Sequence, residues 1–121
     1  MATAVTPLQP ETVRAFVDDW IAAWNRQDIE AVMAFCDDDI EFVSAFLVTM
    51  YDEPSGHLQG KAALRKWFEA SMNNGIHIEP PLYVLTGVDS AVLVESISGT
   101  IAANVFTFGA DGLITRSVVH G

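Results

Sequence analysis

The sequence predicts an α+β domain in which helices cover one face of an antiparallel sheet. Two observations predict this class. Between Pro10 and about Arg26, apolar residues recur at every third or fourth position, which is the pattern of an amphipathic helix. From Ile76 to His120, short segments rich in β-branched residues alternate with turns that contain glycine, which is typical of a meander of strands. We therefore expect a long helix that closes one side of a curved sheet, with a cavity between the two.

Length and charge restrict the possible functions. The chain has 121 residues, which predicts a single domain over residues 1–121. Its formal net charge is −10, from 16 acidic and 6 basic residues, so we expect neither a nucleic-acid partner nor an anionic membrane surface. The basic residues that cluster, Lys61, Arg65 and Lys66, fall on one short predicted helix and are typical of a solvated helix face.

Cysteine usage and the first residues indicate the compartment. Cys36 is the only cysteine, so no intramolecular disulfide can form, and its place on an apolar stripe predicts a buried structural thiol. The opening sequence MATAVTPLQP lacks the basic start and long apolar run of a signal peptide. We therefore expect a cytoplasmic protein.

Two helices are predicted before the first strand. Pro10 and Glu11 suit the first turn of a helix, since proline needs no N–H there and glutamate complements the dipole. Asp28 is an N-cap for a second helix, whose apolar stripe runs through Cys36. Aspartates 37–39 should end it in a solvated turn. A metal site at this triplet is not expected, because no histidine or further carboxylate lies at ligand spacing.

The rest of the chain is predicted from its periodicity and its turns. From Ile40 the period becomes two, so that alternate residues as far as Phe46 share one face, and residues 50–56 form a loop. A third helix begins at Gly60 and ends at residues 73–75; its buried face is Leu64, Trp67, Phe68 and Met72. Four strands are expected after it, over residues 76–85, 91–97, 101–108 and 113–120, with Pro80-Pro81 forcing an edge or a bulge in the first.

Four sequence segments together indicate a family. They are W-x-x-A-W-N-x-x-D at residues 20–28, D-D-D-I-E-F at 37–42, G-K-x-x-L-R-x-W-F at 60–68 and D-G-L-I-T-R at 111–116. In this order the chain resembles the nuclear transport factor 2-like superfamily, and within it the SnoaL-like proteins. The resemblance implies a cone-shaped fold, with three helices packed on the concave face of a curved antiparallel sheet. It leaves the chemistry open, because the superfamily includes ketosteroid isomerases, limonene epoxide hydrolases, scytalone dehydratases and polyketide cyclases.

The resemblance to ketosteroid isomerases can be compared residue by residue. Trp20, Ser44 and Asn104 fall where that family has its tyrosine, its general-base aspartate and its second aspartate. All three differ, and a serine cannot abstract a carbon-bound proton without its own base, so the isomerase reaction is not expected. The superfamily commonly works without a cofactor, and the chain shows no cofactor motif. Its three histidines fit no triad or metal motif.

One hairpin decides which side chains face the cavity. If Ser98-Gly99 is a two-residue loop, Glu95 pairs with Ala102, Leu93 pairs with Asn104, and all four share a face. A three-residue loop would turn Glu95 toward solvent or a subunit interface. With the two-residue loop, Glu95 is the candidate catalytic base and Asn104 the candidate hydrogen-bond donor, although Asn104 could instead be a core amide. The candidate ligand-binding residues are Trp20, Phe42, Ser44, Trp67 and Phe106.

Two functions follow as hypotheses. The first is an isomerase, cyclase or hydrolase that needs no cofactor and acts on a small apolar carbonyl or epoxide compound. The second is a module without catalysis that binds a small ligand or serves for dimerisation. The opposite face of the meander carries only apolar residues at several positions, namely Val92, Val94, Val105 and Val118. Such a face is expected to be covered, and a homodimer formed through the sheet would cover it.

Overall fold

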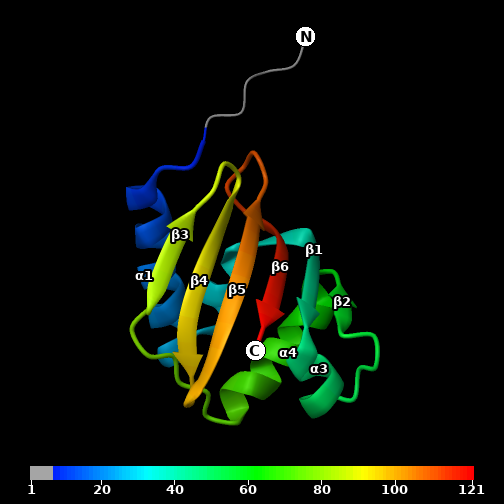
Figure 1. Cartoon of the computed structure of the whole chain (residues 1–121). Coiled ribbons are helices and arrows are strands. Elements are labelled where there is room, and N and C mark those ends of the chain that lie inside the picture. Colours follow the sequence, from blue (N-terminus) through cyan, green and yellow to red (C-terminus); the bar gives the residue numbers. More distant parts are fainter. Residues whose placement is uncertain (1–6) are drawn as a thin grey trace.

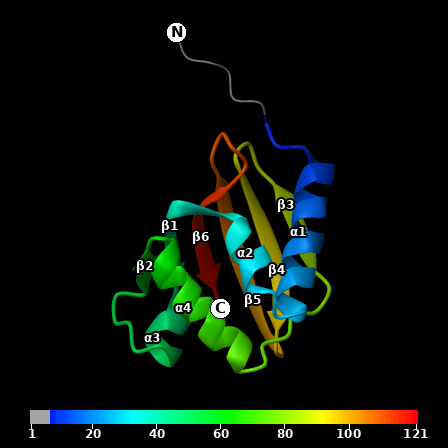
Figure 2. The same ribbon diagram turned by 180° about the vertical axis from the view of Figure 1, so that it is seen from behind.

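The computed structural model describes residues 7–121, so the expectation about the opening sequence lies in part outside the described residues. These residues form one sheet with helices packed against one of its faces (Figures 1 and 2). The elements are α1 (Pro10–Asn25), α2 (Ile29–Ala34), β1 (Cys36–Ser44), α3 (Ala45–Met50), β2 (His57–Gln59), α4 (Lys61–Asn73), β3 (Tyr83–Thr86), β4 (Ser90–Ile97), β5 (Thr100–Phe108) and β6 (Ile114–His120).

The six strands are ordered β2-β1-β6-β5-β4-β3, and α1, α2 and α4 lie across one face of this sheet (Figure 2). The predicted fold class is confirmed. The sheet differs in one detail, because β1 and β6 run parallel while every other neighbouring pair is antiparallel. A parallel pair needs a long connection, and these two neighbouring strands are joined by residues 45–113.

The helix α1 forms where the apolar stripe predicted it. Pro10 occupies its first turn, and Val17, Trp20 and Trp24 are among its buried residues. Asp28 caps α2 as predicted, since its carboxylate accepts a hydrogen bond from the N–H of Ala31 at 3.0 Å. That bond is the main cause of the lowered pKa of Asp28.

The end of α2 corrects the prediction for Cys36 and the aspartates. The helix ends at Ala34, and Cys36 begins β1 instead of continuing the helical stripe. This segment joins the sheet because Cys36 pairs with Ile114 of β6. The N–H of Ile114 donates a hydrogen bond of 2.8 Å to the carbonyl of Phe35. Residues 37–39 therefore lie in β1, where the register with β6 shifts between Cys36 and Glu41. Cys36 itself is buried, and burial raises the pKa of its thiol to about 12.

A short helix, α3, replaces the predicted end of the first strand. Ile40, Phe42 and Ser44 are buried on one side of β1 as expected, but the strand does not continue to Phe46. Ser44 is instead the N-cap of α3, and its hydroxyl oxygen accepts from the N–H of Phe46 at 3.1 Å. The strand thus ends and the helix begins at Ser44, because its hydroxyl oxygen accepts a hydrogen bond from the backbone N–H of Phe46.

The strand predicted over residues 76–85 is much shorter in the structure. It is reduced to β3, an edge strand, while Ile78 makes a single bridge to Ile97. Pro80 and Pro81 explain the loss, because they have no N–H to donate to a neighbouring strand.

The β4–β5 hairpin has a two-residue loop, which is one of the two loop lengths that the sequence left open. Ser98 and Gly99 both have positive φ, of 47° and 89°, which is the backbone of a type I′ turn. Ile97 pairs with Thr100, Glu95 with Ala102 and Leu93 with Asn104. The register that places Glu95 on the inner face of the sheet is therefore confirmed.

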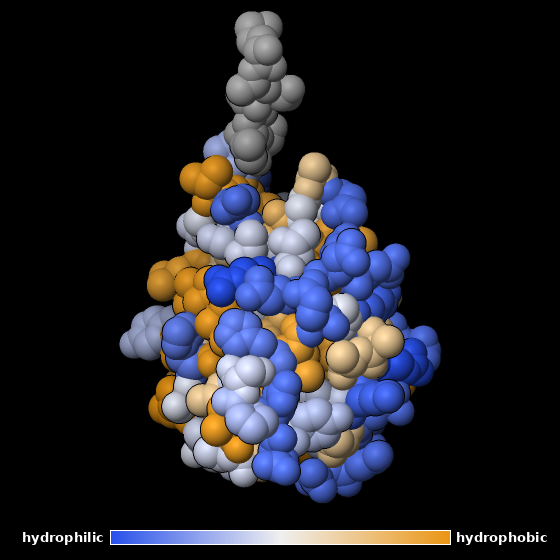
Figure 3. Space-filling view, turned by 90° about the vertical axis from the view of Figure 1, so that its right-hand side faces the viewer, coloured by the Kyte–Doolittle hydropathy of each residue, from blue (hydrophilic) through white to orange (hydrophobic). Residues whose placement is uncertain are grey.

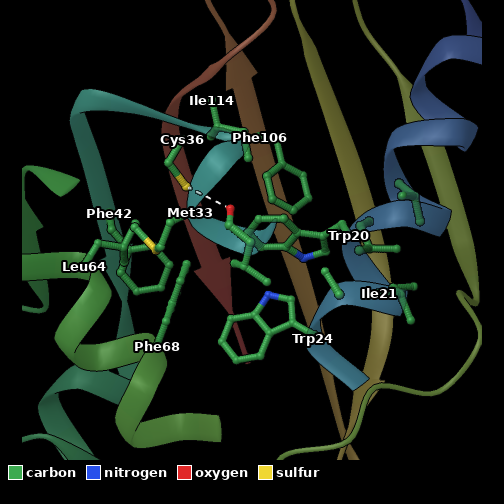
Figure 4. Close-up of a cluster of buried hydrophobic side chains, with 14 of the residues drawn as sticks. Trp20, Ile21, Trp24, Met33, Cys36, Phe42, Leu64, Phe68, Phe106 and Ile114 are labelled. Atoms are coloured by element: carbon green, nitrogen blue, oxygen red, sulfur yellow. Dashed lines mark hydrogen bonds between the residues drawn. The ribbon is translucent and has the colours of Figure 1, made fainter. Parts of the chain in front are cut away.

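Aromatic rings fill one part of the interior. The Trp20 ring lies with its centroid 5.2 Å from that of Phe106 and 5.9 Å from that of Phe35, both at steep angles. Figure 4 shows Trp20 beside Phe106, with Trp24 next to Trp20 in the same cluster; the ring centroid of Trp24 lies 4.8 Å from that of Phe68. The core between α1, α2 and the sheet is thus closely packed around Trp20.

Candidate ligand cavity

A cavity of about 410 Å³ lies between the inner face of the sheet and helices α1, α3 and α4. This volume is in the range of small-molecule sites. Its walls come from Trp24, Phe42, Ser44, Phe46, Met50, Tyr51, Trp67, Phe68, Ala70, Ser71, Asn74, Ile76, Ile78, Glu95, Ile97, Ser98, Thr100 and Val119. Helices and strands from both the first and the second half of the chain therefore contribute to the cavity wall.

Aromatic side chains form much of the cavity wall. Phe68 is central, with its ring centroid 4.8 Å from that of Trp24 and 5.6 Å from that of Phe42, both edge to face. Tyr51 and Trp67 form a second pair, 5.0 Å apart. This wall favours an apolar ligand with few polar groups.

Glu95 lies in this wall and is 2% exposed. Its cross-strand partner, Ala102, carries only a methyl group, which leaves space beside the longer glutamate side chain. The carboxyl atom Oε2 is buried without a hydrogen-bond partner among the described residues. Desolvation by burial raises the pKa of Glu95 from 4.5 to about 7, so near neutral pH both the acid and the carboxylate are populated.

Trp24 is a second residue of the cavity wall with an unpartnered polar group. Its indole Nε1 is buried and has no acceptor among the described residues. The ring is held at the end of α1, where the next residue, Asn25, exchanges two hydrogen bonds of 2.8 Å with the backbone of Ile78. Buried polar groups in proteins normally have a partner, so an unpartnered donor and an unpartnered carboxyl in one cavity indicate a place for a polar ligand atom.

Four of the predicted site residues line the cavity. Phe42 and Ser44 come from β1, Trp67 from α4 and Glu95 from β4. Ser44 is buried, and its role as the cap of α3 also positions Phe46, Met50 and Tyr51 at the cavity. A sequence signal for this did exist, because a serine ahead of an apolar run is typical of a helix start.

The other three predicted residues are placed in the core and do not line the cavity. Trp20 and Phe106 pack against each other in the aromatic cluster. Asn104 is 5% exposed, and its Oδ1 accepts a hydrogen bond of 2.8 Å from the hydroxyl of Ser117. This arrangement is the core amide that the sequence left open. Trp24, one helical turn from Trp20, takes the place in the wall that was predicted for Trp20. It belongs to the last turn of α1, which is the part of this helix that borders the cavity.

The described residues show no arrangement of three or more His, Cys, Asp or Glu side chains that could hold a metal ion. The histidines lie apart: His57 is 3.7 Å from Glu41, and His77 is 3.4 Å from Glu79, both at the surface. In residues 7–121, no helix combines the length and apolar character needed to cross a membrane. The polar chemistry of the cavity therefore comes from Glu95, Trp24 and a few hydroxyl and amide groups.

A family model described as the SnoaL-like domain matches residues 17–117. The chain belongs to this family. The match spans α1 to β6 and so includes both walls of the cavity. The family places the chain in the nuclear transport factor 2-like superfamily, as the resemblance implied. No curated protein matches the chain.

Solved structures agree with the family. A SnoaL-like protein of unknown function from Burkholderia thailandensis is 30% identical, with a TM-score of 0.88, and the alignment covers 94% of this chain and 97% of that one. A putative polyketide cyclase from Sinorhizobium meliloti is 21% identical, with a TM-score of 0.73 and coverage of 93% and 100%. The epoxide hydrolase/cyclase-like enzyme SalBIII, which has a role in pyran ring formation in the polyether salinomycin, is 19% identical, with a TM-score of 0.72 and coverage of 90% and 89%. The last two likenesses concern the fold alone.

Proposed function

We propose that the chain binds a small, mostly apolar molecule in this cavity and that Glu95 exchanges a proton with it. One observation carries the proposal: the carboxyl of Glu95 lies unpartnered in a largely aromatic cavity, and burial raises its pKa to about 7. A general acid or base works best when its pKa lies near the working pH. Carboxyls tuned in this way are concentrated at functional sites.

The two protonation states suit two reactions. As a carboxylate, Glu95 can take a proton from a carbon next to a carbonyl group, as an isomerase or cyclase requires. As an acid, it can give a proton to an epoxide oxygen, as a hydrolase or cyclase requires. The Nε1–H of Trp24 takes over the donor role first assigned to Asn104, since Trp24 lines the cavity and Asn104 does not. None of these steps needs a cofactor, and names such as polyketide cyclase and epoxide hydrolase/cyclase-like among the structural neighbours are in keeping with them.

The test is a turnover screen on small apolar ketones and epoxides. On any substrate found, Glu95→Gln should lower kcat by a factor of about 10² to 10⁴, the usual contribution of a general acid or base. Glu11→Gln, which removes one exposed carboxylate from the first turn of α1, is the matched control and should keep the parent rate. A base mechanism gives a rate that rises with pH through about 7, and an acid mechanism gives one that falls. A Glu95→Gln variant as active as the parent would end the catalytic proposal.

A ligand-binding module without catalysis is the second candidate. One observation supports this candidate. Proton transfer needs an oriented carboxyl, and Oε2 of Glu95 has no hydrogen bond to any described residue that would orient it. Calorimetric binding of ketones or epoxides without turnover would identify this function.

The proposal includes a homodimer formed through the outer face of the sheet, in the cytoplasm. In β3, β4 and β5 that face carries no charged side chain, although the chain has 22 charged residues. Tyr83 and Leu85 are 67% and 58% exposed there. In Figure 3 hydrophobic surface gathers at the left, on the side of this outer face, while hydrophilic residues cover most of the rest.

Sedimentation tests the dimer. At micromolar concentration the chain should sediment as a dimer, and Val105→Lys, at the centre of this face, should raise the dimer dissociation constant by at least about tenfold, because a charge is then desolvated in the interface. Ala15→Lys, on the exposed side of α1, adds the same charge and should have no effect. A parent that sediments only as a monomer would contradict the proposal.

A further inference from the structure

We infer that the cavity binds a lipophilic amine as its ammonium ion, with the Glu95 carboxylate as counter-ion and aromatic rings around the cation. The inference rests on the proposed function only in taking this cavity as the ligand site. It goes further by naming the charge of the ligand.

The carboxyl of Glu95 has no ionic partner in the part of the cavity wall that the structure describes. Glu95 is the only carboxyl among the described residues that line the cavity, and none of these lining residues is Lys, Arg or His. The chain therefore offers no cation to Glu95 from the wall, and Oε2 has no hydrogen-bond donor there. A buried charge is stable only when it is paired and hydrogen-bonded. An ammonium ligand supplies both the opposite charge and the N–H donor.

The cavity wall is rich in aromatic side chains that can face a cation. Six aromatic side chains among the described residues line the cavity: Trp24, Phe42, Phe46, Tyr51, Trp67 and Phe68. Aromatic faces attract a cation within about 6 Å of the ring centroid, most strongly when the cation is desolvated, and tryptophan is the best of them. Aromatic rings and one carboxyl in the same cavity wall thus suit an alkylammonium group better than a neutral or anionic one.

The net charge of the chain also favours a cationic ligand. The formal net charge of −10 raises the local concentration of cations and repels anions. The other titratable side chain in the wall is Tyr51, from the end of α3; the lining contributed by α1, α4, β1, β5 and β6 is free of titratable groups among the described residues. Changes in affinity near neutral pH therefore report on Glu95.

The inference also separates the two reaction classes of the proposed function. Opening an epoxide with acid assistance develops positive charge on the substrate, whereas removing a proton beside a carbonyl develops negative charge on oxygen. A wall of aromatic faces and one carboxylate stabilises the first kind of charge. Amine binding would therefore favour an epoxide over a ketone as the substrate.

The experiment compares three ligands of one shape and different charge. Isothermal titration calorimetry, with tryptophan fluorescence as a second signal because Trp24 and Trp67 lie in the wall, measures binding of adamantylmethylamine, adamantylmethanol and adamantanecarboxylate. The corresponding cyclohexyl compounds repeat the series at a smaller size. At pH 8 the amine should bind at least tenfold more tightly than the alcohol, and the carboxylate most weakly.

The pH profile links the amine to Glu95. Between pH 6 and pH 8 the affinity for the amine should rise about tenfold, because the ionised fraction of a carboxyl with a pKa of about 7 rises by that factor. The alcohol, which has no charge to pair, should not follow this rise. Glu95→Gln should remove the pH dependence and bring the affinity for the amine to the level of the alcohol. Glu11→Gln also removes one negative charge, and it should keep the pH dependence and the preference for the amine. The melting curve of Glu95→Gln checks its fold, and the profile of the parent decides alone if the variant does not fold.

The outcomes are distinct. Equal affinity for amine and alcohol at pH 8, or a pH-independent affinity for the amine, would overturn the inference and leave the proposed cavity function intact. Tightest binding of the carboxylate would overturn it as well. If no compound of either size binds, and the ketones and epoxides of the turnover screen do not bind either, the inference and the proposed function both fail.

Discussion

The interior of the molecule has a filled part and an open part, and the two tryptophans of α1 belong one to each. Trp20 lies in the filled part, with the rings of Phe16, Trp24, Phe35, Phe68 and Phe106 at centroid distances of 5.2 to 6.2 Å. Trp24, one helical turn later, lines the cavity. Figure 4 shows the two rings side by side in one cluster of buried side chains, with Phe106 next to Trp20. Two tryptophans on the same face of α1 thus have different roles: Trp20 packs in the core, and Trp24 forms part of the cavity wall.

The polar groups of the two parts differ in the same way. In the filled part, the Oδ1 of Asn104 is satisfied by the hydroxyl of Ser117 at 2.8 Å. In the open part, Oε2 of Glu95 and Nε1 of Trp24 have no partner among the described residues. A buried polar group that is fully bonded needs no further explanation, whereas two unbonded groups at one cavity need a ligand or water to complete them. The candidate site is therefore located by polar groups that lack a hydrogen-bond partner, and not by the presence of a polar residue alone.

The largest expected effect separates the two tryptophans. Trp20→Ala should lower the free energy of unfolding by about 3–5 kcal/mol, because it removes a buried ring that packs against five other aromatic rings. Trp24→Ala should cost about 1–2 kcal/mol less, since one side of its ring already faces open space and loses fewer contacts. Urea unfolding of both variants beside the parent measures the difference. Equal losses would show that Trp24 is packed like Trp20 and would remove the comparison.

Much of this fold was predictable because it follows from local patterns. The helical stripe of α1, the cap at Asp28 and the I′ turn at Ser98-Gly99 each depend on residues close in sequence. The inward direction of Glu95 depends on the length of this turn, which the sequence left open between two and three residues and which the structure shows to be two.

The remaining features depend on contacts between distant parts of the chain. Cys36 begins a strand because β6 pairs with it, a neighbour that the helical stripe could not reveal. Phe46 belongs to α3 because the hydroxyl of Ser44 bonds the backbone there, although the alternating pattern itself favoured a strand. Whether Trp20 or Trp24 lines the cavity depends on where α1 ends over the sheet, and periodicity places both on one face.

The second prediction sharpens the comparison through the stability of the chain at different pH values. Glu95 has a pKa of about 7 in the folded chain against an ordinary value of 4.5, so the folded state binds its proton more tightly than the unfolded state. The contribution of this group is therefore fully stabilising below about pH 4.5 and is lost as the pH rises through 7. At about 1.4 kcal/mol for each pKa unit, the loss between pH 4.5 and 8 is about 3 kcal/mol.

Glu95→Gln has no such proton, so its free energy of unfolding should match the parent near pH 4.5 and exceed it by up to about 3 kcal/mol at pH 8. Asp28 and Glu30, whose pKa values are lowered by the N–H of Ala31 and by Arg65 respectively, affect both proteins equally and cancel in the difference. Urea unfolding of the two proteins from pH 4.5 to 8 measures it. Parallel stability profiles would mean that Glu95 titrates at its ordinary pKa, as a hydrated or paired carboxylate does. In that case the open part of the interior would not hold a carboxyl tuned by burial, and the strongest argument for acid or base chemistry in the cavity would be lost.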